Sequence, residues 1–139
     1  MTQIDFYVLP RDGSLPVVNA VGRIAEKAVS RGHRIFVSVC DEEQAHNFDS
    51  APWTFRAESF LPHALVSDCG EEPVSIGWLE PPLEQNDVLI NTTGAILDYF
   101  SRFTRVAEIV APDDSSLASS RNAWRFYRDR GYSLSKHDL

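Results

Sequence analysis

The sequence predicts an α/β sandwich, in which helices flank a largely parallel sheet. Strand-like and helix-like segments alternate along most of the 139 residues. The first strand, helix and strand occupy residues 4–39, which is the size of a βαβ unit with a right-handed crossover. A chain of this length is typical of one domain, so we expect a single α/β domain over residues 1–139.

The first βαβ unit follows from its apolar pattern. Residues 4–9 are apolar almost throughout, as in a strand covered on both faces. A loop is expected at 10–16, followed by an amphipathic helix at 17–31 that Gly32 ends. The second strand is expected at 34–39.

A short helix is expected at 42–49, where Asp41 is a suitable N-cap. Glu42 and His46 lie four residues apart on it and could in principle hold a metal ion. No third ligand is signalled. We therefore prefer a solvated helix face with an ion pair, and we expect no metal site.

An aromatic loop is expected at 51–63, where three large aromatic residues lie between two prolines without helical or strand period. Loops lie on the surface, so Trp53 and Phe60 are either tucked under this loop or exposed for a partner. The residues themselves leave both interpretations open.

The second half of the chain continues the alternation. Its expected elements are a loop at 66–73, a strand at 74–79, a loop at 80–86, a strand at 87–91, a helix at 94–103, a strand at 105–110 and a helix at 113–131. The helix at 94–103 would turn Leu97, Phe100 and Phe103 inward. Residues 132–139 are expected to be a frayed end.

The helix at 113–131 has two occupied faces. At 100° per residue, five side chains lie within roughly 100° of one another. They are Leu117, Arg121, Trp124, Arg125 and Arg128. Ala123, Phe126 and Tyr127 point elsewhere and can pack on a core. Guanidinium groups around an indole suit an anionic group attached to an apolar one. The alternative is a helix dipole complemented by arginines, with a tryptophan that belongs to the core.

The formal net charge of −7 argues against nucleic acid as the main ligand, because DNA binding depends on phosphate neutralisation. Four of the thirteen basic residues nevertheless lie between Arg121 and Arg130, which favours a small acidic partner. Cys40 and Cys69 have neither zinc nor redox spacing. Without a long apolar run or an N-terminal signal pattern, we expect a soluble, cytoplasmic protein without membrane contact.

No catalytic or nucleotide-binding motif is present: the sequence contains no G-x-S-x-G, H-E-x-x-H, P-loop or Rossmann glycine fingerprint. The turn after the first strand has only Gly13, between Pro10 and Pro16, which lack N–H donors. We therefore expect no catalytic residues and no cofactor. The alternative is a small α/β nucleotide- or metabolite-binding enzyme with an unrecognised site.

Six ordered segments resemble the chi subunit of bacterial DNA polymerase III, over essentially the whole chain. They are Phe6-Tyr7-Val8-Leu9, the helix start Cys40-Asp41-Glu42-Glu43-Gln44-Ala45, the loop Trp53…Ala57-Glu58-Ser59-Phe60-Leu61-Pro62-His63, Asp87-Val88-Leu89-Ile90-Asn91, the helix start Asp113-Asp114-Ser115, and Arg121…Trp124-Arg125…Tyr127-Arg128…Gly131. The resemblance implies a Rossmann-like three-layer sandwich without nucleotide activity. It also implies a non-catalytic subunit of the clamp-loader assembly that pairs with psi and binds single-stranded-DNA-binding protein.

The binding expected from this resemblance is to the acidic C-terminal tail of the single-stranded-DNA-binding protein. That tail ends in aspartates, then Ile-Pro-Phe with a free carboxylate. By the resemblance, Arg121 engages the tail end, while Trp124 walls and Val110 floors the phenylalanine pocket. Arg125 suits the tail aspartates.

Two points of the resemblance concern the partners. A lysine of some family members is Leu117 here, so one acidic contact is either absent or supplied by Arg128. Trp53 and Phe60 match aromatic residues on a separate surface, which binds psi or an iron–sulfur helicase that competes for the same place.

Overall fold

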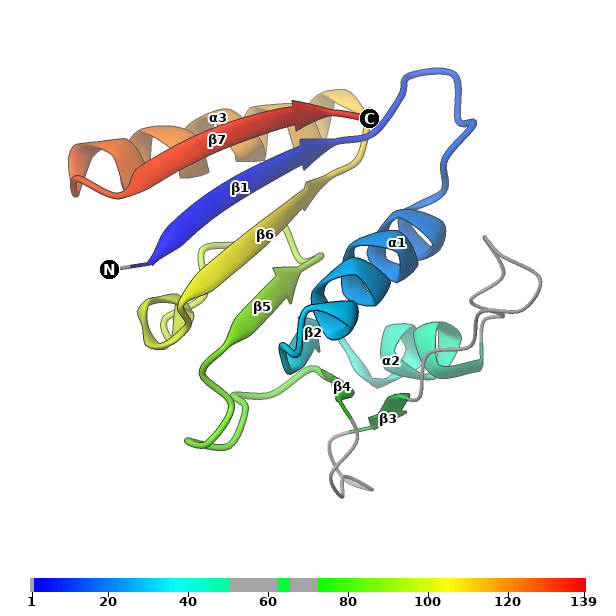
Figure 1. Ribbon diagram of the computed structural model, residues 1–139. Coiled ribbons are helices and arrows are strands. Elements are labelled where there is room, and N and C mark those ends of the chain that lie inside the picture. Colours follow the sequence, from blue (N-terminus) through cyan, green and yellow to red (C-terminus); the bar gives the residue numbers. More distant parts are fainter. Residues whose placement is uncertain (1, 51–62, 66–72) are drawn as a thin grey trace.

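A seven-stranded sheet forms the centre of the computed structural model, which describes residues 2–50, 63–65 and 73–139 (Figure 1). The strand order is β3-β4-β2-β5-β6-β1-β7, and every neighbouring pair is parallel. The strands are β1 (Gln3–Val8), β2 (Ile35–Ser38), β3 (His63–Leu65), β4 (Val74–Gly77), β5 (Val88–Asn91), β6 (Arg105–Val110) and β7 (Ser133–Asp138). The predicted α/β class with a largely parallel sheet is confirmed.

Helices cover both faces of this sheet and complete a three-layer sandwich. The helices α1 (Val17–Ser30) and α2 (Glu42–Ser50) lie on one face, and α3 (Asp114–Asp129) lies on the other (Figure 1). Successive strand residues face alternate layers, so Ile35 belongs to the core under α1 whereas Phe36 belongs to the core under α3. Most of the helices and strands predicted from the sequence are present in the structure, and their ends differ from the predicted ends by a few residues.

The predicted helix at 94–103 is wrong. The segment contains turns and one short 3₁₀ helix, η2 (Phe100–Arg102), after Gly94 with a φ of +78°. Asn91 stabilises these turns, because its Nδ2 donates to the carbonyl oxygen of Ala95 at 2.7 Å. Phe100 and Phe103 are nevertheless buried, since a spacing of three also suits a 3₁₀ turn.

The predicted frayed end at 132–139 is also wrong, because β7 pairs with β1 along its whole length. The backbone N–H of Leu139 extends this pairing by donating to the carbonyl oxygen of Val8 at 2.9 Å. The polar sequence of β7 gives little sign of a strand, because a strand at the edge of a sheet needs few apolar residues. The short edge strand β3 at His63–Leu65 was likewise not expected from the sequence.

Within the described ranges, no helix is long and apolar enough to cross a bilayer. The same ranges contain no group of three His, Cys, Asp or Glu side chains suited to a metal ion. Glu42 Oε1 lies 3.5 Å from His46 Nε2 on α2, as the ion-pair interpretation predicts.

Candidate functional site

The start and end of α3 are fixed by local hydrogen bonds. The Asp113 carboxylate accepts from the backbone N–H of Ser116 at 2.8 Å and from its hydroxyl at 2.9 Å. These bonds hold the pKa of Asp113 below its usual value. Gly131, with a φ of +82°, turns the chain after the helix so that β7 can begin.

The residues that α3 buries against the sheet fix the orientation of the helix about its own axis. Ala123 and Tyr127 are buried against the sheet, as the two-faced pattern predicts. The ring of Tyr127 packs edge-on against Phe6 and Phe100, with centroid distances of 6.1 and 5.0 Å. Phe126 is partly buried at the edge of the same cluster. With this side buried, Arg121 and Trp124 lie towards β1 and β7.

A buried carboxyl anchors Tyr127, and sequence reasoning missed it. Glu108 on β6 is 5% exposed and accepts from the Tyr127 hydroxyl at 2.7 Å. Asn91 Nδ2 donates to both carboxyl oxygens, at 3.2 and 2.9 Å. Burial raises the pKa of Glu108 to about 7, although both neighbours act in the opposite direction. A glutamate within the apolar run 106–110 was the sequence signal for this network.

The predicted residues Arg121 and Trp124 share a cavity of about 290 Å³, which we call the α3–β7 cavity. Its lining comes from three elements: Phe6 and Val8 of β1, Leu117, Ser120, Arg121 and Trp124 of α3, and Lys136 of β7. The indole of Trp124 lies against Phe6 at a centroid distance of 5.2 Å. Within the described part of the chain, the Arg121 guanidinium has no hydrogen-bond or ion-pair partner. A free guanidinium beside aromatic rings can bind an anion that carries an apolar group.

Val110 lies elsewhere. It is 4% exposed and lines a second cavity of about 170 Å³, which lies between α3 and the end of β6. Phe6 and Ser120 line both cavities, so the two meet beneath α3. The second cavity is rich in hydroxyl groups, from Thr92, Thr93, Ser115, Ser116, Ser119 and Ser120. The structure therefore does not bring Val110 into the cavity that holds Arg121 and Trp124.

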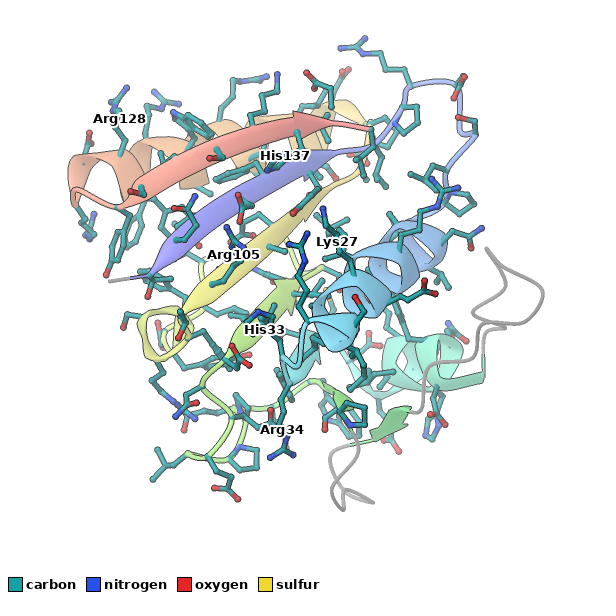
Figure 2. All side chains as sticks on the ribbon, in the orientation of Figure 1. Lys27, His33, Arg34, Arg105, Arg128 and His137 are labelled. Carbon is teal, nitrogen blue, oxygen red and sulfur yellow. The ribbon has the colours of Figure 1, made fainter. Side chains whose placement is uncertain are left out.

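Arg125 and Arg128 do not line the α3–β7 cavity. Arg125 Nη2 donates to Asn122 Oδ1 at 3.0 Å, one turn earlier on the helix. Arg128 is paired with the adjacent Asp129 at 3.1 Å and lies near the C-terminal end of α3 (Figure 2). Arg128 is thus not placed to supply a cation beside Leu117.

Lys136 is the charged residue of this cavity that sequence reasoning missed. It pairs in register with Phe6, which places it on the α3 side of the sheet. Lys136 could be assigned to the cavity only if β7 was recognised as a strand. The sequence of β7, which alternates serine with leucine and charged residues, predicts a strand only weakly. Trp53 and Phe60, the expected second surface, lie outside the described residues.

The turn after β1 uses its own backbone donors. The N–H of Ser14 donates to Asp12 Oδ1 at 2.9 Å, and the N–H of Gly13 is directed at the carbonyl oxygen of Pro10 at 3.4 Å. Pro16, the residue before α1, has no N–H. These amides are therefore not arranged as a phosphate cradle of the P-loop or Rossmann type.

Comparisons with known proteins agree with the resemblance. Residues 1–135 match the family described as DNA polymerase III chi subunit, HolC. The chain is 38% identical over 139 residues to DNA polymerase III subunit chi of Pseudomonas aeruginosa, covering 100% of this chain and 98% of that protein. It is 33% identical over 141 residues to DNA polymerase III subunit chi of Escherichia coli, covering 96% of each. The chain therefore belongs to the family of DNA polymerase III chi subunits.

Proposed function

We propose that this subunit connects the clamp loader to the acidic C-terminal tail of single-stranded-DNA-binding protein during DNA replication. Membership of the chi family implies an accessory role in replication and protein partners in the polymerase assembly. The tail and the clamp-loader connection are our more specific proposals, and they rest on two separate surfaces.

The observation that carries the proposal is the α3–β7 cavity, which Arg121, Trp124 and Phe6 line together and in which the Arg121 guanidinium has no partner among the described residues. The tail ends in a phenylalanine with a free carboxylate, so one terminal residue supplies both an apolar ring and an anion. A guanidinium can hold a carboxylate through two parallel hydrogen bonds, and the aromatic lining can cover the ring.

Charge supports an acidic peptide over a nucleic acid as the ligand. The whole chain carries a formal net charge of −7, which would repel a long polyanion. The cavity nevertheless has two cations, Arg121 and Lys136, in its lining. A short acidic segment can meet these cations without covering the rest of the acidic surface.

The second surface is proposed from Trp53 and Phe60, in the segment that joins α2 to β3 in sequence. Large aromatic residues are frequent centres of binding energy in protein interfaces. We propose that they bind psi, or an iron–sulfur helicase that takes the same place. We also propose that the subunit is not catalytic by itself and needs no cofactor. At the turn after β1, the N–H of Ser14 is already bonded to Asp12 and Pro16 has no N–H, which argues against nucleotide binding there.

The test is calorimetric titration of the subunit with a synthetic tail peptide, beside the same peptide without its terminal phenylalanine. Full-length peptide is expected to bind, and the shortened peptide to lose about 1.5–3 kcal/mol of binding free energy, the value of burying one such side chain. A third peptide with an alanine in place of the phenylalanine separates the ring from the position of the carboxylate. Equal affinity of all three peptides would contradict the proposal.

A further inference from the structure

We propose that Lys136 is the second anion-binding residue of the α3–β7 cavity, and that it receives a side-chain carboxylate of the acidic peptide while Arg121 holds the terminal one. This inference rests on the proposed tail binding. It adds to it a strand, β7, and a residue that the helix pattern does not contain.

The side of the sheet to which Lys136 points follows from register. Lys136 is paired with Phe6, whose ring contacts Trp124 and Tyr127 of α3. His137, the next residue, lies on the opposite face (Figure 2). Its ring stacks on that of Tyr7 with a centroid distance of 4.7 Å. Because side chains alternate along a strand, Lys136 must face α3, and it lines the cavity there.

Both cations are available to a ligand. Arg121 has no ion-pair or hydrogen-bond partner among the residues that the structure describes. Lys136 Nζ lies 3.6 Å from Asp138 Oδ1, and the two side chains are 57% and 74% exposed. Such an exposed pair contributes little and exchanges readily with a competing carboxylate. Lys136 shares the cavity with the apolar side chains of Phe6 and Val8, and long cationic side chains commonly lay their stems along such surface.

The arrangement of the lining defines the class of ligand. Arg121 comes from the helix and Lys136 from the sheet, while Phe6, Val8 and Leu117 contribute apolar surface to the same cavity. A ligand that satisfies this lining has two anionic groups and an apolar group between or beside them. A peptide end with an aspartate, an apolar ring and a free carboxylate has this composition. Since Leu117 is apolar, β7 supplies the cation that this turn of α3 lacks.

The chain offers a matched control, because Lys27 and Lys136 are its only lysines. Lys27 is exposed on α1, which covers the opposite face of the sheet. The experiment titrates wild-type protein, Lys136→Gln and Lys27→Gln with the acidic tail peptide and with a version whose aspartates are asparagines. We expect Lys136→Gln to weaken the acidic peptide about three- to tenfold, as for an exposed charge pair that gains a hydrogen bond. The asparagine peptide should bind wild type and Lys136→Gln alike, and Lys27→Gln should match wild type throughout.

A second readout is the NMR signal of each lysine after reductive ¹³C-methylation, assigned with the two variants. Binding of the acidic peptide should shift the Lys136 signal and leave the Lys27 signal in place. If wild type binds the peptide while Lys136→Gln has wild-type affinity, or loses affinity equally for both peptides, the inference is overturned and tail binding stands. If wild type binds neither peptide, tail binding and the inference are overturned together.

Discussion

Glu108 shows how a single residue positions the candidate site. Its carboxyl is buried at the centre of the sheet, where Tyr127 of α3 and Asn91 of β5 both donate to it. A buried carboxyl that accepts hydrogen bonds from a helix residue and from a neighbouring strand holds the helix at one orientation against two strands. That orientation keeps Tyr127 inward and leaves Arg121 and Trp124 on the flank towards β7.

The raised pKa of Glu108 predicts a specific dependence of stability on pH. The folded protein holds this proton up to about pH 7, whereas the unfolded chain releases it near 4.5. Between these values the folded state binds more protons, so rising pH lowers the contribution of Glu108 to stability. That contribution is fully present below pH 4.5 and falls by about 3 kcal/mol by pH 7, at about 1.4 kcal/mol per pH unit.

The measurement is urea unfolding of wild type and Glu108→Gln between pH 4.5 and pH 7.5. Other titrating groups are common to both proteins, so the difference between their unfolding free energies isolates Glu108. We expect wild type to lose stability relative to the variant as pH rises. A difference that stays constant across this range would show that Glu108 is not buried in a protonated form.

At the scale of elements, β7 adds a strand residue, Lys136, to a site that otherwise consists of residues from α3 and β1. Its pattern places Leu134 and Lys136 on the α3 side and Ser133, Ser135 and His137 on the other. Leu134 packs partly buried against the core under α3. The strand therefore contributes both to the core and to the wall of the cavity.

This packing predicts the effect of two neighbouring substitutions. Leu134→Ala should lower the free energy of unfolding by about 1–2 kcal/mol, less than for a fully buried leucine because the side chain is only partly covered. Ser133→Ala, an exposed position on the other side of the same strand, should have little effect. Chemical unfolding of both variants tests this. Equal stability of the two proteins would mean that residues 132–139 are frayed in solution.

The sequence predicted elements better where apolar residues dominate. Strands β1, β2, β4, β5 and β6 and the helices α1 and α3 have apolar patterns that predict them, and α2 was predicted from its N-cap Asp41. The segment at 94–103 has apolar residues at a spacing of three, which a helix and a 3₁₀ turn share. β7 is polar because it is an edge strand, so its sequence resembles a tail.

In the candidate site, too, local patterns predict only the residues that lie on one element. Arg121 and Trp124 lie on one helix, so helical periodicity alone predicted that they share a face. Lys136 joins them through pairing of the first and last strands, and no local pattern specifies that register. Val110 precedes α3 by a few residues, yet it lines the neighbouring cavity and not the one that Arg121 lines.

For the whole molecule, the first proposed surface lies at one edge of the sheet, while the second is proposed from the sequence, since Trp53 and Phe60 lie outside the described residues. The α3–β7 cavity lies at the β7 edge, whereas β3 forms the other edge in the strand order. Trp53 and Phe60 precede β3 in sequence. Surfaces that share no partner residue should show independent mutational effects.

Separate surfaces predict separable losses. Trp53→Ala combined with Phe60→Ala should abolish pairing with psi or the helicase, and should leave tail-peptide affinity within a few tenths of a kcal/mol. Arg121→Ala should do the reverse. Pull-down with purified psi and helicase, beside peptide titration, measures both, after circular dichroism shows each variant folded. Loss of peptide binding in the folded loop variant would mean that the two clusters form one continuous site.

The central claim, that Arg121 holds the terminal carboxylate of the tail, is tested most directly by a double-mutant cycle. Wild type and Arg121→Ala are each titrated with the tail peptide and with the same peptide amidated at its C-terminus, and Arg128→Ala serves as the control outside the cavity. We predict a coupling energy of about 1.5–3 kcal/mol between Arg121 and the carboxylate, the range for a hydrogen bond to a charged group. We predict almost none for Arg128, which is paired with Asp129. A coupling energy near zero for Arg121 in a folded variant would contradict the assignment of the site.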